Sequence, residues 1–208
     1  MTLRFAEIMF TPSVRAVQES MGSRRAYARL ERPGAPARDQ LGEDEREFIA
    51  ARDSFYMASV SETGWPYVQH RGGPPGFLKV IDAGTLAFAD VRGNRQYVSV
   101  GNVLGNDRVS LILMDYPNRR RLKLLGHARV LDPAADAEKL ALLTDDYDAK
   151  VERGIEIVLE GFDWNCPQHI TPRFTEAEIA GALAALRERL RSLEEENAAL
   201  RKRLEGAS

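Results

Sequence analysis

Residues 54–90 have the sequence SFYMASVSETGWPYVQHRGGPPGFLKVIDAGTLAFAD, and this stretch decides the fold. Short runs rich in β-branched and aromatic residues alternate here with turn residues, such as Glu62-Thr63-Gly64 and Asp82-Ala83-Gly84. This alternation is typical of antiparallel strands joined by tight turns. It predicts strands at 54–60, 66–71, 77–81 and 85–90, followed by strands at 108–114, 121–131 and 154–162.

Helical signals flank and interrupt these strands. Thr11-Pro12-Ser13 forms a helix start, and Gly22 ends the helix that follows. Six or seven strands within about 110 residues favour a small antiparallel barrel over a parallel βαβ array. Further helices are expected at 43–52, 96–104 and 133–147, the last with Pro133 in its first turn.

The composition excludes several classes of protein. The 208 residues include 29 basic and 31 acidic side chains, and this net charge of -2 gives no general attraction to nucleic acid or anionic lipid. No run approaches the roughly 20 apolar residues of a membrane helix, and the N-terminus lacks the pattern of a secretory signal. A single cysteine, Cys166, excludes an intrachain disulfide, so we expect a reducing, cytoplasmic setting.

Residues 175–204 carry the most regular hydrophobic pattern in the chain. Its members are separated alternately by four and three positions, which is the heptad spacing of a coiled coil. The pattern assigns Leu183, Leu190, Asn197 and Leu204 to position a, and Ile179, Leu186, Leu193 and Leu200 to position d.

The residues beside this pattern favour a parallel dimer. In such a dimer Arg189 faces Glu194 of the partner subunit and Glu196 faces Arg201 of the partner subunit, so both pairs attract. A lone Asn197 at position a pairs with its own copy only in a parallel, in-register dimer. One alternative is an amphipathic helix packed on its own barrel. The other, a basic-region zipper, is disfavoured because residues 174–178 are acidic.

The chemistry suggested by the motifs is the binding of an anion. Dinucleotide-binding, Walker, nucleophile-elbow and zinc-protease motifs are absent from the sequence, and the three histidines lack metal-ligand spacing. Polar residues occupy the strand at 67–71, which runs into the glycine- and proline-rich residues 72–76. Residues 90–96 place two arginines at a predicted helix start, where guanidinium groups and free N–H groups together bind phosphate.

Segments 64–71, 88–96 and 106–111 resemble the pyridoxamine 5'-phosphate oxidase-like family of split barrels that bind flavin mononucleotide (FMN). Residues 162–173 are similar to the closing motif of one flavoprotein branch of that family. The resemblance implies a mainly β fold with flanking helices, a six-stranded antiparallel split β-barrel. It also implies a homodimer with FMN at the subunit interface. The expected divisions are an N-terminal helix and loop at 1–42, the FMN-binding domain at 43–174 and a C-terminal coiled-coil helix at 175–208.

The same resemblance implies the roles of individual residues. Residues 69–71 would line the flavin, the pair at 89–90 would flank its ring, and residues 95–96 would hold its phosphate. A late tryptophan and arginine would reach the flavin from the other subunit. The cofactor-binding residues implied are Gln69, His70, Arg71, Ala89, Asp90, Asn94, Arg95, Gln96, Arg121, Trp164 and Arg173.

The expected function is that of an FMN-dependent oxidoreductase acting on a small organic molecule, with a nicotinamide nucleotide as electron source. Pro74 stands where the vitamin-producing oxidase has a lysine that contacts the substrate phosphate, and its late substrate motif is not reproduced around His169. We therefore do not expect pyridoxal phosphate synthesis. Cys166 is a candidate redox-active thiol, the alternative being an ordinary thiol. Haem or a deazaflavin in the same fold, and a non-enzymatic flavin carrier or assembly module, are the remaining alternatives.

Overall fold

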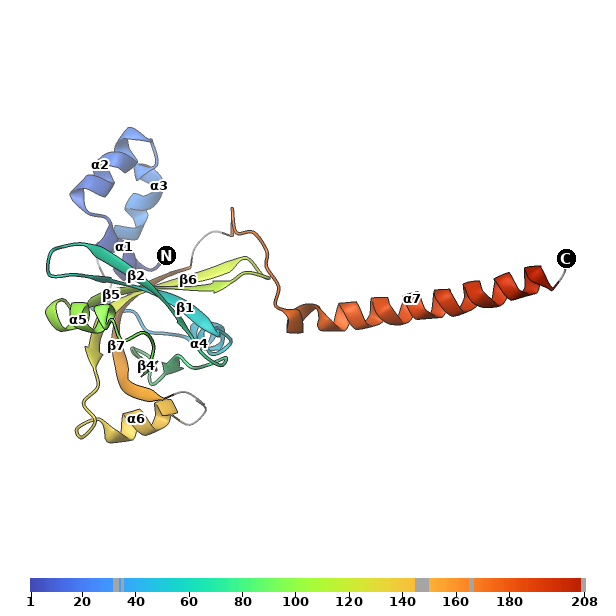
Figure 1. Cartoon of the computed structure of the whole chain (residues 1–208). Coiled ribbons are helices and arrows are strands. Elements are labelled where there is room, and N and C mark those ends of the chain that lie inside the picture. The colour runs from blue at the N-terminus through green and yellow to red at the C-terminus, as the bar shows by residue number, and fades with distance from the viewer. Residues whose placement is uncertain (32–33, 35, 145–149, 165–166, 207–208) are drawn as a thin grey trace. The chain divides into compact units, whose positions relative to one another are not determined.

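The computed structural model describes residues 1–31, 34, 36–144, 150–164 and 167–206, and its centre is one antiparallel sheet (Figure 1). Seven strands follow the order β2-β1-β5-β6-β7-β4-β3. The mainly β, antiparallel fold is thereby confirmed. The strands are β1 (Ser54–Val60), β2 (Pro66–Gly72), β3 (Lys79–Val80), β4 (Thr85–Val91), β5 (Arg108–Asp115), β6 (Arg120–Val130) and β7 (Val151–Trp164).

Six of these strands are long, and β3 has only two residues. The strand predicted at 77–81 is shorter because Phe77 and Leu78 are buried in the core instead, at 5% and 1% exposure. The Phe77 N–H donates to the carbonyl of Pro74, which turns the chain before β3 begins. β3 is therefore a short addition to the edge of a six-stranded arrangement.

The main core lies inside the curled sheet, where alternate residues of β1, β5 and β6 are buried. Phe55 of β1 contacts Phe88 of β4 at 5.2 Å between ring centroids, although β5, β6 and β7 separate these strands in the sheet order. Phe77 stacks on Phe55 at 5.4 Å. Among the described strand pairs none joins β2 to β3 or β4, so the sheet curls around its core without closing. A curled antiparallel sheet that stays open between two of its strands is the predicted split barrel.

Three short helices precede the sheet: α1 (Leu3–Met9), α2 (Pro12–Ser20) and α3 (Arg24–Ala28). The helix expected after Thr11-Pro12-Ser13 is confirmed as α2, because the Thr11 side chain accepts from the Val14 N–H. Gly22 follows it in the left-handed conformation that glycine favours, at φ 73°. We did not expect α1 or α3. A short 3₁₀ turn (Arg29–Glu31) follows α3.

The remaining helices of this part lie against the barrel. The predicted helix at 43–52 is confirmed as α4 (Glu43–Ala50), and that at 96–104 as α5 (Val98–Gly105). The helix predicted at 133–147 begins later, as α6 (Ala137–Thr144). Pro133 was wrongly placed in its first turn. Instead, the Asp132 carboxylate accepts from the N–H groups of Ala134 and Ala135, which forms a turn ahead of the helix.

The C-terminal residues form a separate compact unit. Residues 1–115 and 119–169 make the first unit, whereas residues 116–118 and 170–208 make the second. The predicted C-terminal helix is present as α7 (Glu176–Glu205), and Thr175 and Glu178 form a capping box at its start. The described residues contain no helix with the length and hydrophobicity needed to span a membrane.

Candidate anion-binding site

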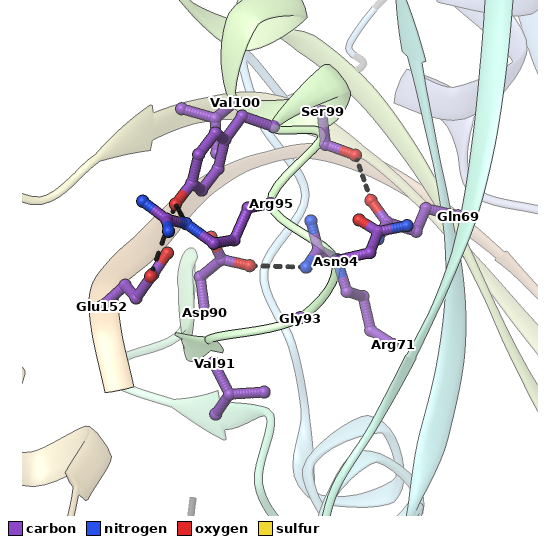
Figure 2. A pocket seen from close by; sticks show the side chains of 11 residues that line it. Gln69, Arg71, Asp90, Val91, Gly93, Asn94, Arg95, Ser99, Val100 and Glu152 are labelled. Carbon is purple, nitrogen blue, oxygen red and sulfur yellow. Dashed lines mark hydrogen bonds and ion pairs between the residues drawn. The ribbon is translucent and has the colours of Figure 1, made fainter. Parts of the chain in front are cut away.

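A cavity of about 260 Å³ lies at one end of the barrel, between β2 and β4 and beneath the start of α5 (Figure 2). The connection from β4 to α5 forms one wall, with Gly93, Asn94, Arg95 and Tyr97, and β7 contributes another side chain. The cavity is lined by Gln69, Arg71, Asp90, Val91, Gly93, Asn94, Arg95, Tyr97, Ser99, Val100 and Glu152.

The connection into α5 has an unusual backbone. Arg95 and Tyr97 adopt left-handed conformations, at φ 63° and 53°, which L-residues rarely occupy. Arg95 Nε donates to the Tyr97 hydroxyl at 3.1 Å, and that hydroxyl donates to Glu152 of β7 at 3.4 Å (Figure 2). The Gln96 N–H donates to the Asn94 side chain. These bonds hold the segment in a conformation that costs energy.

The start of α5 lacks a side-chain cap. Among the described residues no side chain accepts a hydrogen bond from the first-turn N–H groups, because the N-cap residue is Tyr97. Ser99 lies in that turn, but its hydroxyl donates to Gln69 of β2 at 2.7 Å (Figure 2). Helix N–H groups without a cap, at the positive end of the helix dipole, bind anions.

One carboxylate links the two ends of the open sheet. Arg71 of β2 forms an ion pair with Asp90 of β4 at 2.5 Å (Figure 2), and both side chains are largely buried, at 13% and 8% exposure. Arg153 of β7 approaches the other Asp90 oxygen at 3.7 Å. A charged bridge of side chains thus spans the gap between β2 and β4, where backbone pairing is absent from the described strands.

Both carboxylates of the cavity are paired with arginines. Arg153 also contacts Glu152 at 3.0 Å, and Arg92 lies 3.8 Å from the same carboxylate. Two arginines (71 and 95) and two carboxylates (90 and 152) line the cavity, and Arg92 and Arg153 pair with those carboxylates without lining it. The pKa of Arg95 is raised, first by its hydrogen bond to Tyr97 and then by nearby negative charge, so Arg95 stays protonated.

Five of the predicted cofactor-binding residues meet at this cavity: Gln69, Arg71, Asp90, Asn94 and Arg95. His70 lies on the opposite face of β2, exposed and edge-on to Tyr56 at 5.4 Å. The Ala89 side chain is buried in a second apolar cluster, with Leu131 and Leu143. Neither lines the cavity, and their assigned roles stay predictions.

The other predicted residues lie elsewhere in the described structure. Gln96 is exposed in the loop and does not line the cavity. Trp164 donates to Glu45 of α4 at 2.6 Å and packs edge-on against Phe48 at 4.8 Å, so it anchors α4 to the sheet. Arg121 lies on β6, and its Nε is buried without a partner.

Two further predictions concern residues outside the first unit or outside the described structure. Arg173 belongs to the second unit, where its guanidinium lies 4.9 Å above the ring of Tyr116. Cys166 falls outside the described residues, and so does its predicted redox role. The residues that the structure describes contain no cluster of histidine, cysteine and carboxylate side chains able to hold a metal ion.

Sequence reasoning missed several lining residues. Tyr97, Ser99 and Val100 directly follow the predicted phosphate segment, so extending that segment into the helix would have found them. Glu152 had no such signal, because it is more than 50 residues further along the chain and reaches the cavity only through the pairing of β4 with β7.

Comparison with known proteins gives one family and several similar folds. Residues 41–163 match the family model of pyridoxamine 5'-phosphate oxidase. The search of curated proteins found no match. An FMN-binding protein from Syntrophomonas wolfei is 11% identical with a TM-score of 0.46, covering 58% of this chain and 83% of its own.

Two other solved structures show a similar degree of likeness. A protein of the pyridoxinephosphate oxidase family from Clostridium acetobutylicum, related to general stress protein 26, is 18% identical with a TM-score of 0.44, covering 62% of this chain and 88% of its own. An F420 reductase is 20% identical with a TM-score of 0.42, covering 59% of this chain and 98% of its own.

Proposed function

The chain belongs to the pyridoxamine 5'-phosphate oxidase family, and from this premise we propose that it binds FMN in the cavity between β2, β4 and α5. The observation that carries the proposal is the uncapped start of α5, which lies beside Arg95 at a cavity whose two carboxylates are already paired with arginines. A phosphate monoester supplies the acceptors and the negative charge that this arrangement lacks.

The described residues fit both the phosphate and the ring system of FMN. Arg95 and the first-turn N–H groups of α5 would hold the phosphate. Arg71 lines the cavity while its guanidinium is held by Asp90. Gln69 and Ser99, already bonded to each other, offer polar edges beside the apolar wall of Val91 and Val100. A flat ring system needs that combination of an apolar surface and a few polar edges.

We propose that the protein is an oxidoreductase acting on a small organic molecule, with a nicotinamide nucleotide as electron source. Bound FMN would supply the hydride and electron transfer, which no side chain of the cavity performs by itself. The protein's own contribution is to bind, orient and shield: Arg95 neutralises the phosphate, and the Arg71–Asp90 pair holds the two edges of the cavity together. Production of pyridoxal phosphate is not part of the proposal, because Pro74 replaces the lysine of the vitamin-producing oxidase.

We further propose a homodimer in which the partner subunit completes the site. A cavity of about 260 Å³ is small for a cofactor of this size, since ligand pockets usually measure about 300–1,000 Å³. The ring would extend beyond the single chain, where a second subunit would cover it. A reducing, cytoplasmic setting is part of the same proposal and rests on the single cysteine.

The test is the absorption spectrum of the purified protein, followed by titration with FMN. We expect the two absorption bands of an oxidised flavin and a stoichiometric, saturable uptake of FMN. A Soret band would instead identify haem, and a single deazaflavin band would identify a deazaflavin; either would overturn the FMN assignment.

A matched pair of variants ties the binding to the cavity. Arg95→Gln removes one charge-assisted contact and should weaken FMN binding about tenfold or more. Arg25→Gln removes an equal charge from an exposed position on α3 and should leave the affinity unchanged. Equal affinities for the two variants would place the phosphate elsewhere. Reduction of the bound flavin by a nicotinamide nucleotide, followed by stopped-flow absorbance, tests the proposed electron source.

A further inference from the structure

Helix α7 presents a continuous apolar seam that its own unit does not cover. We define the seam as the residues at heptad positions a and d, namely Ile179, Leu183, Leu186, Leu190, Leu193, Asn197, Leu200 and Leu204. Its apolar side chains are 38–71% exposed. Thirty consecutive residues of α7 are helical, which gives the seam a single unbroken backbone. Seven large apolar side chains on one exposed stripe predict an interaction surface.

The charges beside the seam identify what covers it. Position g carries Arg189 and then Glu196, and position e carries Glu194 and then Arg201. In a parallel pair each g side chain faces the e side chain five residues further along the partner, so both contacts are attractive. Each contact occurs twice in a symmetric dimer. The charges of α7 therefore complement those of a second, parallel copy of α7.

Asn197 determines the orientation of the two helices. Parallel, in-register helices place each a residue beside its own copy, so the two Asn197 amides can bond to each other. Antiparallel helices place a residues beside d residues, so Asn197 would be buried against a leucine without a partner, at a cost in free energy. In the single helix the Asn197 oxygen accepts from Arg201 at 3.0 Å, and Glu196 of the partner subunit would take over that arginine.

We propose that α7 forms a parallel, in-register, two-stranded coiled coil with a second copy of this chain. This interface lies in the second compact unit and needs neither the cavity nor a cofactor. A dimer joined by α7 would hold two barrels at a high effective concentration, which would favour any contact between the barrels that is weak by itself.

Cysteine cross-linking on the full chain tests the register directly. In a Cys166→Ser background, Asn197→Cys places one thiol at position a, beside its own copy. Ala199→Cys is the matched control, two residues away at the outward position c. Under air oxidation we expect a disulfide-linked dimer from Asn197→Cys at least tenfold faster than from Ala199→Cys. Equal rates, or no linked dimer from either variant, would overturn the proposal.

A charge-exchange experiment tests the pairing between positions g and e. Both variants carry Asn197→Cys and Cys166→Ser. One adds Glu196→Arg, so that two arginines face each other in its homodimer, and the other adds Arg201→Glu, which juxtaposes two glutamates. A mixed dimer restores attraction at both contacts, so in a thiol–disulfide buffer it should exceed the half expected from random pairing.

Random pairing of the two variants would show that these side chains do not face each other and would overturn the parallel arrangement. Neither experiment measures flavin. A chain that cross-links at residue 197 but binds no FMN would therefore support the coiled coil while contradicting the proposed function.

Discussion

Gly126 lies where β6 and β7 slip in register, between Leu125 and Gly126. A Cβ atom at this position would lie 2.6 Å from the Val158 carbonyl oxygen and 2.8 Å from a methyl group of Ile157. The backbone oxygen cannot move away without breaking the ladder of β7. The close approach of two strands, rather than a left-handed φ, therefore requires glycine here.

Gly126→Ala should lower the free energy of unfolding of the first unit by about 1–3 kcal/mol, the usual cost of overpacking. Urea unfolding followed by tryptophan fluorescence measures this, because Trp65 and Trp164 both belong to that unit. Gly101→Ala in α5 is the control. Its added Cβ meets nothing within 4 Å, so the higher helix propensity of alanine should stabilise the protein slightly. An equal fall in the free energy of unfolding of both variants would show that the close contact at Gly126 is not the cause.

Asp90 shows how far residue-scale prediction extends. It begins the segment 90–96, in which Arg92 and Arg95 predicted an anion site from the local sequence. Its pairing with Arg71 and Arg153 could not be predicted, because Arg153 is opposite it only through the pairing of β4 with β7, and Arg71 reaches it only when the sheet curls. The alternation of β2 does separate His70 from Gln69 and Arg71, and applying that period would have placed His70 on the other face.

At the scale of elements, α6 is tied to the sheet by a network of charges. Arg129 of β6 contacts Asp136 ahead of α6 at 2.8 Å and Glu156 of β7 at 2.7 Å, while Lys139 of α6 pairs with Glu156. The Arg129 hydrogen bond, helped by the N–H of Asp132, lowers the pKa of Asp136 from its ordinary 3.8 to about 2. The apolar residues Leu140 and Leu143 cover β4 and β7 beneath this network.

This pKa sets the pH range in which the Asp136 contact stabilises the fold. The pKa is lower in the folded state, so the contribution is complete above about pH 4 and disappears as the pH falls through about 2. Asp136→Asn should therefore be less stable than the wild type at neutral pH, and the two should converge between pH 4 and pH 2. Thermal unfolding across that range measures the difference.

Glu138→Gln provides the comparison for this pH dependence. Glu138 lies exposed on the same helix and has no ion pair among the described residues, so its variant should follow the wild type over the same range. A difference between Asp136→Asn and wild type that persists unchanged at pH 2 would contradict the assignment.

Helix boundaries were predictable where the capping chemistry is local. Thr11-Pro12 began α2 as expected, since both the cap and the first-turn proline act within one turn. Pro133 suggested a helix start in the same way, but Asp132 uses its carboxylate to form a turn instead. α1 was missed because its buried residues, Phe5 and Ala6, pack against β7, a contact that no local pattern reveals.

At the scale of the whole molecule, the two compact units should respond differently to ligand. FMN that binds the cavity stabilises the first unit directly, by about 2.7 kcal/mol when its concentration is about 100 times the dissociation constant. For a chain of this length that corresponds to a rise in melting temperature of about 5–10 °C. Differential scanning calorimetry should show this rise in the transition of the first unit.

Arg95→Gln should reduce this rise at the same FMN concentration, and Arg25→Gln should preserve it. The melting of α7 should instead depend on protein concentration, because it requires a second copy. The absence of any shift in the transition of the first unit would contradict FMN binding.

The sequence by itself determined the features that depend on neighbouring residues. The strand spacing at 54–90, the heptads at 175–204 and the arginine-rich segment at 90–96 each follow from periodicity or from chemistry within a turn or two. These suffice for the class of fold, the exposed seam of α7 and the expectation of an anion.

Only the tertiary structure decided which distant side chains meet. Arg71 reaches Asp90 because the sheet curls until β2 and β4 face each other. Glu152 joins the cavity wall through the pairing of β4 with β7, and Trp164 bonds to Glu45 because α4 packs on the sheet. The degree of curl depends on how Phe55, Phe77 and Phe88 pack in the core. That packing sums many weak contacts between residues far apart in the chain, so no local segment encodes it.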